Sequence, residues 1–219
     1  MNNVVLEKPA GTGPWPGVVV LHDALGVSSD IKNITRRFAD NGFLATAPSL
    51  FAGRSPAKCI RAVVREVVAQ DNEAVGDILA ARRTLAEHPD CSGKVGVVGF
   101  CLGGGFALLV APKGFDAAAP FYPSVLPMYD TLVEGACPVV ASFGARDPLN
   151  PGNAARLRKS LDRRGIENDI KVYPGVGHSF ANVMPAQGLA RIVGFGYNEE
   201  ATDDAFARVF SFFRTHLEP

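Results

Sequence analysis

Cys101 is the residue in this chain best placed for nucleophilic chemistry. It stands in a Gly-x-Cys-x-Gly turn, between a Val-rich run at 94–100 and a small-residue segment at 102–111. A short apolar run rich in Val is typical of a buried strand, and the pattern that follows it suits a helix. The stretch therefore predicts a nucleophile elbow with the thiol at its corner. Gly99 and Gly103 lack the side chains that would keep the crossing backbones apart.

Asp147 and His178 are the partners that such a thiol requires. Each follows directly after a predicted strand, at 138–143 and 169–173. The carboxyl ends of parallel strands lie at one edge of a sheet, so the three side chains should meet there. The imidazole takes the thiol proton, while the carboxylate fixes the ring tautomer and stabilises its charge. The chain order of nucleophile, acid and histidine is the order expected of α/β hydrolases.

Each of the three residues also has a simpler interpretation. A cysteine after a buried strand is often an inert, small apolar residue. Asp147 in an Arg-Asp-Pro turn suits an ordinary Asx turn, and His178 suits a solvated loop. Their joint placement in the right order favours the catalytic triad.

An acyl-transfer site also needs two hydrogen-bond donors for the oxyanion. The backbone N–H of Leu102, at the positive end of the predicted helix, supplies the first. The second is expected from Ala24, in the loop after the first core strand. Asp23 in the same loop either caps the following turn or places a second carboxylate near the thiol, where it would affect the ionisation of the thiol.

The elements that position these residues alternate along the chain. Besides the elbow, the pattern predicts strands at 4–7, 17–21, 43–47, 117–121, 138–143 and 169–173. It predicts helices from Ser28 or Ser29 to 41, and at 57–87, 152–164 and 203–217. This alternation indicates an α/β fold, a three-layer α/β/α sandwich with a mostly parallel central sheet. A length of 219 residues suits one domain, 1–219.

Composition excludes several classes of function. Lys and Arg total 22 and Asp and Glu total 22, so the net charge of zero offers nothing to a nucleic acid. The sequence shows neither a signal-peptide pattern nor an apolar run of about 18 residues, so we expect a cytoplasmic protein without membrane contact. The four cysteines are far apart, which favours free thiols over disulfides or a metal site: Cys59, Cys91, Cys101 and Cys137. We expect Cys91 in a loop.

The motifs around these residues resemble the dienelactone hydrolase family over nearly the whole chain. The matching segments are Gly-Phe-Cys-Leu-Gly-Gly at 99–104, Ala-Pro-Ser-Leu-Phe at 47–51 and Gly-His-Ser-Phe at 177–180, together with Tyr197 and the Ala-rich C-terminal helix. The resemblance implies an α/β-hydrolase fold and a triad of Cys101, Asp147 and His178. It implies hydrolysis of a small carboxylic ester or lactone through an acyl-cysteine, without a metal or organic cofactor.

Two positions depart from the family pattern. Asp23 stands where characterised relatives have a glutamate that holds or activates the thiol. Asn182 stands where relatives that act on dienelactone have one of two arginines that bind its carboxylate, and the candidates for the other are Arg54, Arg61 and Arg65. We therefore expect uncharged substrates, in a mainly apolar pocket lined by Phe51, Phe180 and Asn182 and covered by the segment 183–196.

A different class of function remains open from the sequence. The alternative is a protein that binds a ligand without catalysis, or a redox sensor whose Cys101 is oxidised rather than acylated. Retention of Asp147 and His178 favours the enzyme. The expected partner is a small ester or lactone, and the expected assembly is a monomer or small homo-oligomer.

Overall fold

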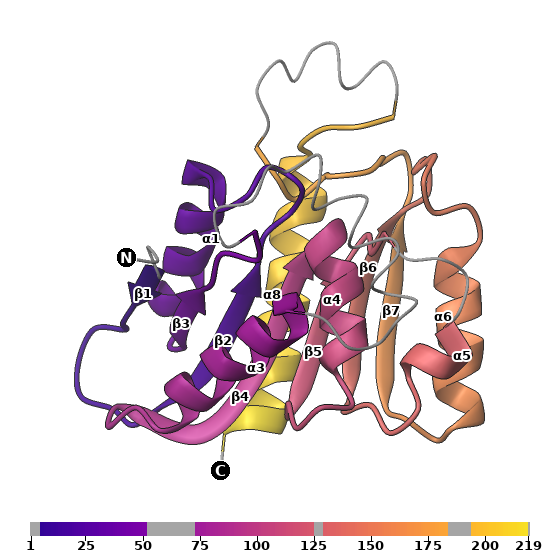
Figure 1. The fold of residues 1–219 in the computed structure, drawn as a ribbon. Helices are drawn as coiled ribbons and strands as arrows, with labels where there is room; N and C mark the ends of the chain where they lie inside the picture. Colours follow the sequence, from indigo (N-terminus) through magenta and orange to yellow (C-terminus); the bar gives the residue numbers. More distant parts are fainter. Residues whose placement is uncertain (1–4, 52–72, 125–128, 184–193, 219) are drawn as a thin grey trace.

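The central element of the computed structural model is a seven-stranded sheet. The structure describes residues 5–51, 73–124, 129–183 and 194–218, and the statements below concern these residues. The strands lie in the order β1-β3-β2-β4-β5-β6-β7 (Figure 1). Their bounds are β1 Val5–Glu7, β2 Trp15–Leu21, β3 Leu44–Ala47, β4 Cys91–Phe100, β5 Ala117–Phe121, β6 Val139–Gly144 and β7 Asn168–Tyr173. Strand β1 pairs with β3 in antiparallel fashion, and the other pairings are parallel.

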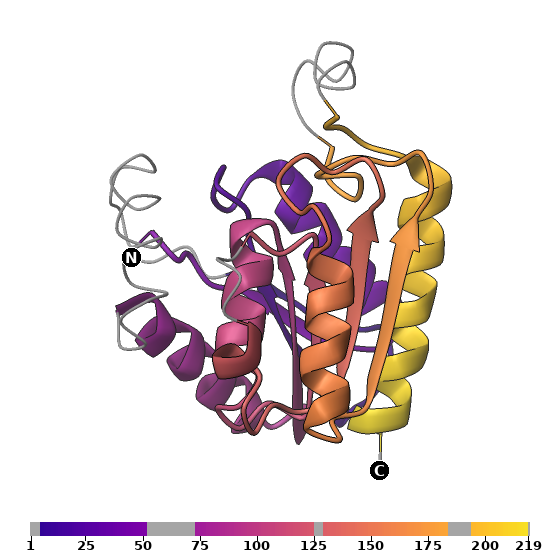
Figure 2. The ribbon, with the colours of Figure 1, turned by 90° about the vertical axis from the view of Figure 1, so that its right-hand side faces the viewer.

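Helices cover both faces of this sheet (Figures 1 and 2). Their bounds are α1 Ser29–Asp40, α3 Glu73–Ala86, α4 Leu102–Val110, α5 Tyr129–Leu132, α6 Asn153–Arg163 and α8 Glu199–Leu217. Helices α1 and α8 pack on one face, and α3, α4 and α6 pack on the other. None of the helices in the described part of the chain is both long and apolar enough to span a bilayer.

The strands are apolar on both sides because both faces are covered. In β2, Val18 and Val20 belong to the core beneath α1 and α8, whereas Val19 and Leu21 belong to the core beneath α3 and α4. Successive side chains of a strand point to opposite faces, so an unbroken Val run fills two cores at once. The predicted three-layer α/β sandwich is confirmed.

Several predicted boundaries were wrong. The last helix begins at Glu199 instead of 203, because the Asn198 side chain accepts the Ala201 N–H at 2.9 Å and so caps it. Cys91 lies in β4, where it pairs with Trp15, and not in a loop. Helix α5 was not predicted. The first part of the helix expected at 57–87 lies outside the described residues.

Candidate active site

The predicted elbow is present between β4 and α4. Strand β4 ends at Phe100, Cys101 has φ 53°, and α4 begins at Leu102. A Cβ on Gly99 would lie 2.0 Å from the Gly103 carbonyl oxygen, and one on Gly103 would lie 2.3 Å from the Leu21 oxygen. Both glycines are therefore required for α4 to start this close to β2 and β4. The Cys101 N–H donates to the Phe121 oxygen at 3.1 Å, which fixes the corner against β5.

His178 and Asp147 form a buried pair at the same edge of the sheet. His178 Nδ1 lies 2.8 Å from Asp147 Oδ2, and the two side chains are 1% and 0% exposed. The carboxylate also accepts the Leu149 N–H and the Asn150 amide, each at 2.8 Å. Burial alone would raise the pKa of Asp147, but these hydrogen bonds outweigh it and lower the pKa. The pair is therefore an oriented imidazole beside an ionised carboxylate.

Nε2, the ring nitrogen of His178 that is not bonded to Asp147, is the atom that can exchange a proton with Cys101. Burial lowers the pKa of His178, but the Asp147 carboxylate and the nearby Cys101 sulfur outweigh it and raise the pKa to about 9. Nε2 is buried and has no partner with hydrogen-bond geometry among the described residues, although the sulfur is close enough to contribute to that pKa. This nitrogen is available to exchange a proton with a group in the site.

Residues 194–196, the end of the segment expected to cover the pocket, pair with the backbone of His178. The His178 N–H donates to the Gly194 oxygen at 2.7 Å, and the Gly196 N–H donates to the His178 oxygen at 3.0 Å. The Phe195 ring lies 5.2 Å from the imidazole. A Cβ on Gly177 would lie 2.0 Å from the Gly194 oxygen, so glycine is needed for this close approach. Segment 194–196 thus fixes the position of the ring.

The loop after β2 brings Asp23 and Ala24 to this edge. Asp23 Oδ1 accepts the Leu25 N–H at 2.8 Å, and α1 is capped by Ser28, which accepts the Ile31 N–H at 3.3 Å. Asp23 therefore forms a local turn and does not cap α1. Burial raises the pKa of Asp23, and the nearby Asp30 raises it further.

His22 ties this loop to the segment after β3. Its Nε2 accepts the Leu50 N–H at 2.9 Å, so the proton is on Nδ1, which donates to the Asp23 oxygen at 2.6 Å. Burial lowers the pKa of His22, consistent with a neutral ring. The Phe51 ring packs edge-on against it at 4.6 Å. His22 is a structural residue that shapes the loop carrying Ala24.

The two expected oxyanion donors lie at the ends of β2 and β4. Leu102 is the first residue of α4, and the first N–H groups of a helix have no intrahelical acceptor. In the β2 loop, the N–H groups of Leu25 and Gly26 bond to the Asp23 side chain and to the Asp23 oxygen. Among the described residues the N–H of Ala24 has no acceptor, and its role as the second oxyanion donor stays a prediction.

The residues expected to line the substrate pocket are more buried than the sequence suggested. Asn182 is 1% exposed, with its Oδ1 accepting the Tyr122 hydroxyl at 2.5 Å and its Nδ2 donating to Asp30 at 2.8 Å. Phe180 is fully buried and packs against Phe121, Tyr122 and Tyr173. Phe180 therefore belongs to the core beneath the site. The expected arginines at 54, 61 and 65, and residues 184–193 of the expected cover, lie outside the described residues.

Ser124 is a site residue that the sequence analysis missed. Its Oγ lies 3.3 Å from the Cys101 sulfur, and its N–H donates to the Cys101 oxygen at 3.0 Å. Its signal was a hydroxyl three residues after the end of a core strand, which is too common a feature to single out.

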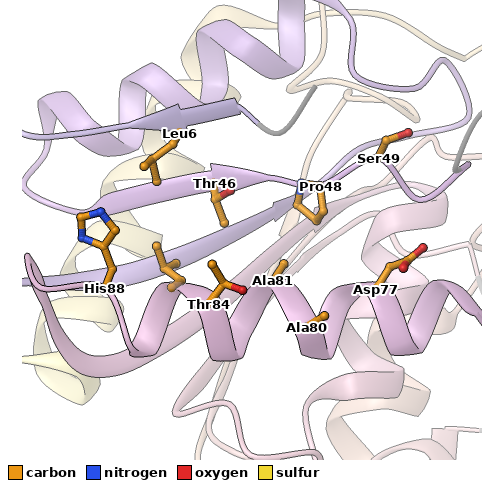
Figure 3. A pocket seen from close by; sticks show the side chains of 10 residues that line it. Leu6, Thr46, Pro48, Ser49, Asp77, Ala80, Ala81, Thr84 and His88 are labelled. Atoms are coloured by element: carbon orange, nitrogen blue, oxygen red, sulfur yellow. The ribbon is translucent and has the colours of Figure 1, made fainter. Parts of the chain in front are cut away.

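A separate pocket lies away from these residues. A cavity of about 280 Å³ separates α3 from the edge formed by β1 and β3, with His88 toward one end and Ser49 and Asp77 toward the other (Figure 3). None of the residues that line it is a candidate catalytic residue. In the described part of the chain, no group of three or more His, Cys, Asp or Glu side chains could hold a metal ion.

Comparison with known proteins gives consistent matches over most of the chain. The model of the dienelactone hydrolase family matches residues 3–217. Carboxymethylenebutenolidases of Pseudomonas putida and Pseudomonas knackmussii are each 31% identical, over 87% of this chain and 85% of the relative. The solved structure of a dienelactone hydrolase-like promiscuous phosphotriesterase from metagenomic libraries is 26% identical, with a TM-score of 0.80 over 94% of this chain and 88% of that chain.

Proposed function

The chain belongs to the dienelactone hydrolase family and is a carboxylic ester hydrolase, and on this premise we propose that it cleaves small esters or lactones through an acyl-cysteine on Cys101. The observation that carries the proposal is the buried His178–Asp147 pair, joined at 2.8 Å, with the Cys101 sulfur near enough to the imidazole to raise its pKa. A thiol at a helix N-terminus next to an oriented imidazole is the arrangement that nucleophilic acyl transfer requires.

Acylation begins from the state in which the Cys101 proton is already on His178 Nε2, a state that the raised pKa of the imidazole favours. The sulfur attacks the carbonyl carbon, and the carbonyl π electrons move onto oxygen, which the N–H groups of Leu102 and Ala24 stabilise. The tetrahedral intermediate then re-forms the carbonyl and breaks the bond to the leaving oxygen. His178 gives its proton to that oxygen, which departs as an alcohol or, in a lactone, stays attached as a hydroxyl of the acyl group.

Deacylation reverses these roles with water as the nucleophile. His178 removes a proton from water, the hydroxide adds to the thioester carbon, and the same two N–H groups stabilise the second oxyanion. Collapse of this intermediate breaks the carbon–sulfur bond and releases the carboxylic acid. The thiolate is left beside the protonated His178, so the enzyme is regenerated without a cofactor.

The substrate class that we propose is uncharged. A bidentate arginine is the side chain best suited to a substrate carboxylate, and position 182 carries an amide whose two ends are already bonded to Tyr122 and Asp30. Neither Asn182 nor Asp30 offers positive charge to an anion. We therefore expect a higher kcat/KM for neutral short esters or lactones than for dienelactone.

Intact-mass spectrometry with an activated short-chain ester tests the mechanism. The wild type should show a transient increase in mass equal to one acyl group, and Cys101→Ala should show none and lose turnover. His178→Ala should be nearly as inactive. Cys137→Ala is a matched control, because it removes a thiol two residues before β6 begins, at the edge of the sheet opposite the candidate site, and should retain activity.

Two results would overturn this proposal. Turnover of Cys101→Ala within a few-fold of the wild type would remove the thiol from the mechanism. An acyl group that stays on Cys101→Ala would assign the nucleophile elsewhere.

Rate comparison of a neutral butyrolactone-type substrate with dienelactone tests the substrate class, and a wild type that prefers dienelactone would contradict it.

A further inference from the structure

The thiol of Cys101 has a hydrogen-bond partner outside the predicted triad. Ser124 Oγ lies 3.3 Å from the sulfur, within the range of a hydrogen bond to sulfur. Asp23, which was expected either to cap a turn or to lie near the thiol, accepts the Leu25 N–H through Oδ1, and among the described residues no hydrogen bond joins it to the sulfur. Among the described residues, the hydroxyl of Ser124 is thus the side-chain group bonded to the sulfur in this conformation.

Ser124 is fixed in place by its backbone as well as its side chain. Its N–H donates to the Cys101 oxygen at 3.0 Å, so two bonds join the two residues. The chain reaches this position by a sharp turn after β5, in which Tyr122 has φ 34° and its N–H donates to the Ser142 oxygen at 2.7 Å. Because the turn is bonded to β6 and to Cys101, the backbone of Ser124 is held beside Cys101, at a position from which its hydroxyl reaches the sulfur.

The chemistry of the two groups shows which protonation state this contact favours. A hydroxyl donates a strong, charge-assisted hydrogen bond to an anionic sulfur, whereas a neutral thiol is only a weak donor to a hydroxyl. A contact that is stronger for the anion shifts the equilibrium toward the anion. The thiolate is the attacking group in acylation and the leaving group in deacylation, so both steps involve the favoured form.

We propose that Ser124 is a positioning residue whose hydroxyl orients the Cys101 sulfur and stabilises its thiolate. The inference concerns the nucleophile of the proposed function and assigns it a donor besides His178. It also gives the loop after β5 a role in the site, alongside the loops that carry Ala24, Asp147 and His178.

The pH profile of alkylation by iodoacetamide tests this role without any substrate. The rate of adduct formation on Cys101 is measured by peptide mass spectrometry between pH 5 and 10, with Cys101→Ala as background for the other thiols. In Ser124→Ala the pH midpoint of alkylation should rise by about one unit, because the thiolate loses a charge-assisted hydrogen bond that the neutral thiol forms only weakly. Ser211→Ala, the same change on the exposed side of α8, should leave the midpoint unchanged.

Other charged and titratable groups around the sulfur stay the same in all these variants. They are His178 with Asp147 behind it, Asp23 and Asp30 from the β2 loop and α1, and Tyr122 from the β5 loop. A difference between Ser124→Ala and the wild type therefore reports the hydroxyl.

Ser124→Thr and Ser124→Val distinguish the effect of the hydroxyl group from the effect of side-chain volume. The two replacements have nearly the same shape, but only threonine keeps the donor. The proposal requires a midpoint near that of the wild type for threonine and a raised midpoint for valine, and this pair decides the matter even if Ser124→Ala does not fold. An unchanged or lowered midpoint in Ser124→Val, or equal shifts in the pair, would overturn it. Because alkylation needs no turnover, this result is independent of whether an acyl-cysteine forms.

Discussion

The groups around Cys101 come from three different loops, and each has a different contact. The β5 loop contacts its sulfur and its carbonyl oxygen through Ser124. The β7 loop provides His178, and the β6 loop provides the Asp147 carboxylate that orients the imidazole. Because the pair is almost completely buried, the charge on one partner strongly affects the other.

Replacing Asp147 by Asn should lower the pKa of His178. The amide keeps a hydrogen-bond acceptor for the ring but removes the negative charge that stabilises the imidazolium. We expect the pKa to fall by at least about one unit from its value of about 9 in the wild type. NMR titration of the imidazole protons measures this, with the resonance assigned from His178→Gln.

Asp40→Asn is the control for that titration. Asp40 lies at the last turn of α1 and is exposed, so the same change of charge there should leave the His178 pKa in place. An equal pKa in the wild type and Asp147→Asn would show that the carboxylate does not stabilise the charged ring.

At the residue scale, the sequence indicated groups whose chemistry is apparent from residue type and strand order. Cys101, Asp147 and His178 were placed at one edge because each follows a strand. The contacts of Ser124 and Phe195 were not foreseen, because they depend on the approach of segments distant in sequence. Asn182 was expected to face a substrate, but its amide is hydrogen-bonded to Tyr122 and to Asp30. The bond to Asp30 depends on where α1 lies in the fold, and the spacing of residues in the sequence does not give that position.

At the element scale, the elbow depends on backbones that touch without side chains between them. Strand β4 lies between β2 and β5, and α4 must start against both. Gly99 at the end of the strand and Gly103 at the start of the helix permit that contact, and α4, fully buried along its length, continues it. The geometry of the nucleophile is thus set by packing of the backbone.

Gly99→Ala should destabilise the protein by about 3 kcal/mol or more, because the new Cβ would lie 2.0 Å from a carbonyl oxygen that cannot move independently of α4. Gly76→Ala on α3 is the matched control. Among the described residues, no atom outside its own helix backbone and chain neighbours lies within 4 Å of the new Cβ, and alanine favours a helix, so the change should stabilise by up to about 1 kcal/mol. Urea unfolding of both variants measures the difference, and similar stabilities would contradict this account of the elbow.

The types of the elements were predictable because a sheet covered on both faces and amphipathic helices leave clear patterns in the sequence. The residues at which the helices and strands begin and end were less predictable. Helix α8 begins four residues early because of a single side-chain cap at Asn198, and β4 extends back to Cys91 because Trp15 pairs with it. Both boundaries depend on one local contact and leave the apolar periodicity unchanged.

At the scale of the whole molecule, the charge state of the site is linked to the stability of the fold. The folded pKa of His178 is about 9, compared with 6.5 for a free histidine, so the folded protein binds a proton more tightly than the unfolded chain. This stabilisation is fully present below about pH 6.5 and is lost as pH rises through about 9.

The free energy of unfolding should therefore fall with pH more steeply in the wild type than in His178→Gln. The difference between the two proteins should change by roughly 2 to 3 kcal/mol between pH 6 and pH 9.5. Urea unfolding at both pH values measures it. A difference that stays constant with pH would show that His178 binds its proton no more tightly in the folded state.

Among the described residues, three that are not glycine have positive φ, and all three lie in loops that meet at this edge: Cys101 at 53°, Tyr122 at 34° and Ser179 at 58°. For side chains other than glycine, such conformations cost about 1 to 3 kcal/mol each, an appreciable share of the stability of a domain. Mutations that relax these positions would be favoured whenever heat tolerance is the only trait under selection. Directed evolution for thermal stability alone should therefore yield stable variants that have lost activity. Each round of such a selection has to include a measurement of turnover.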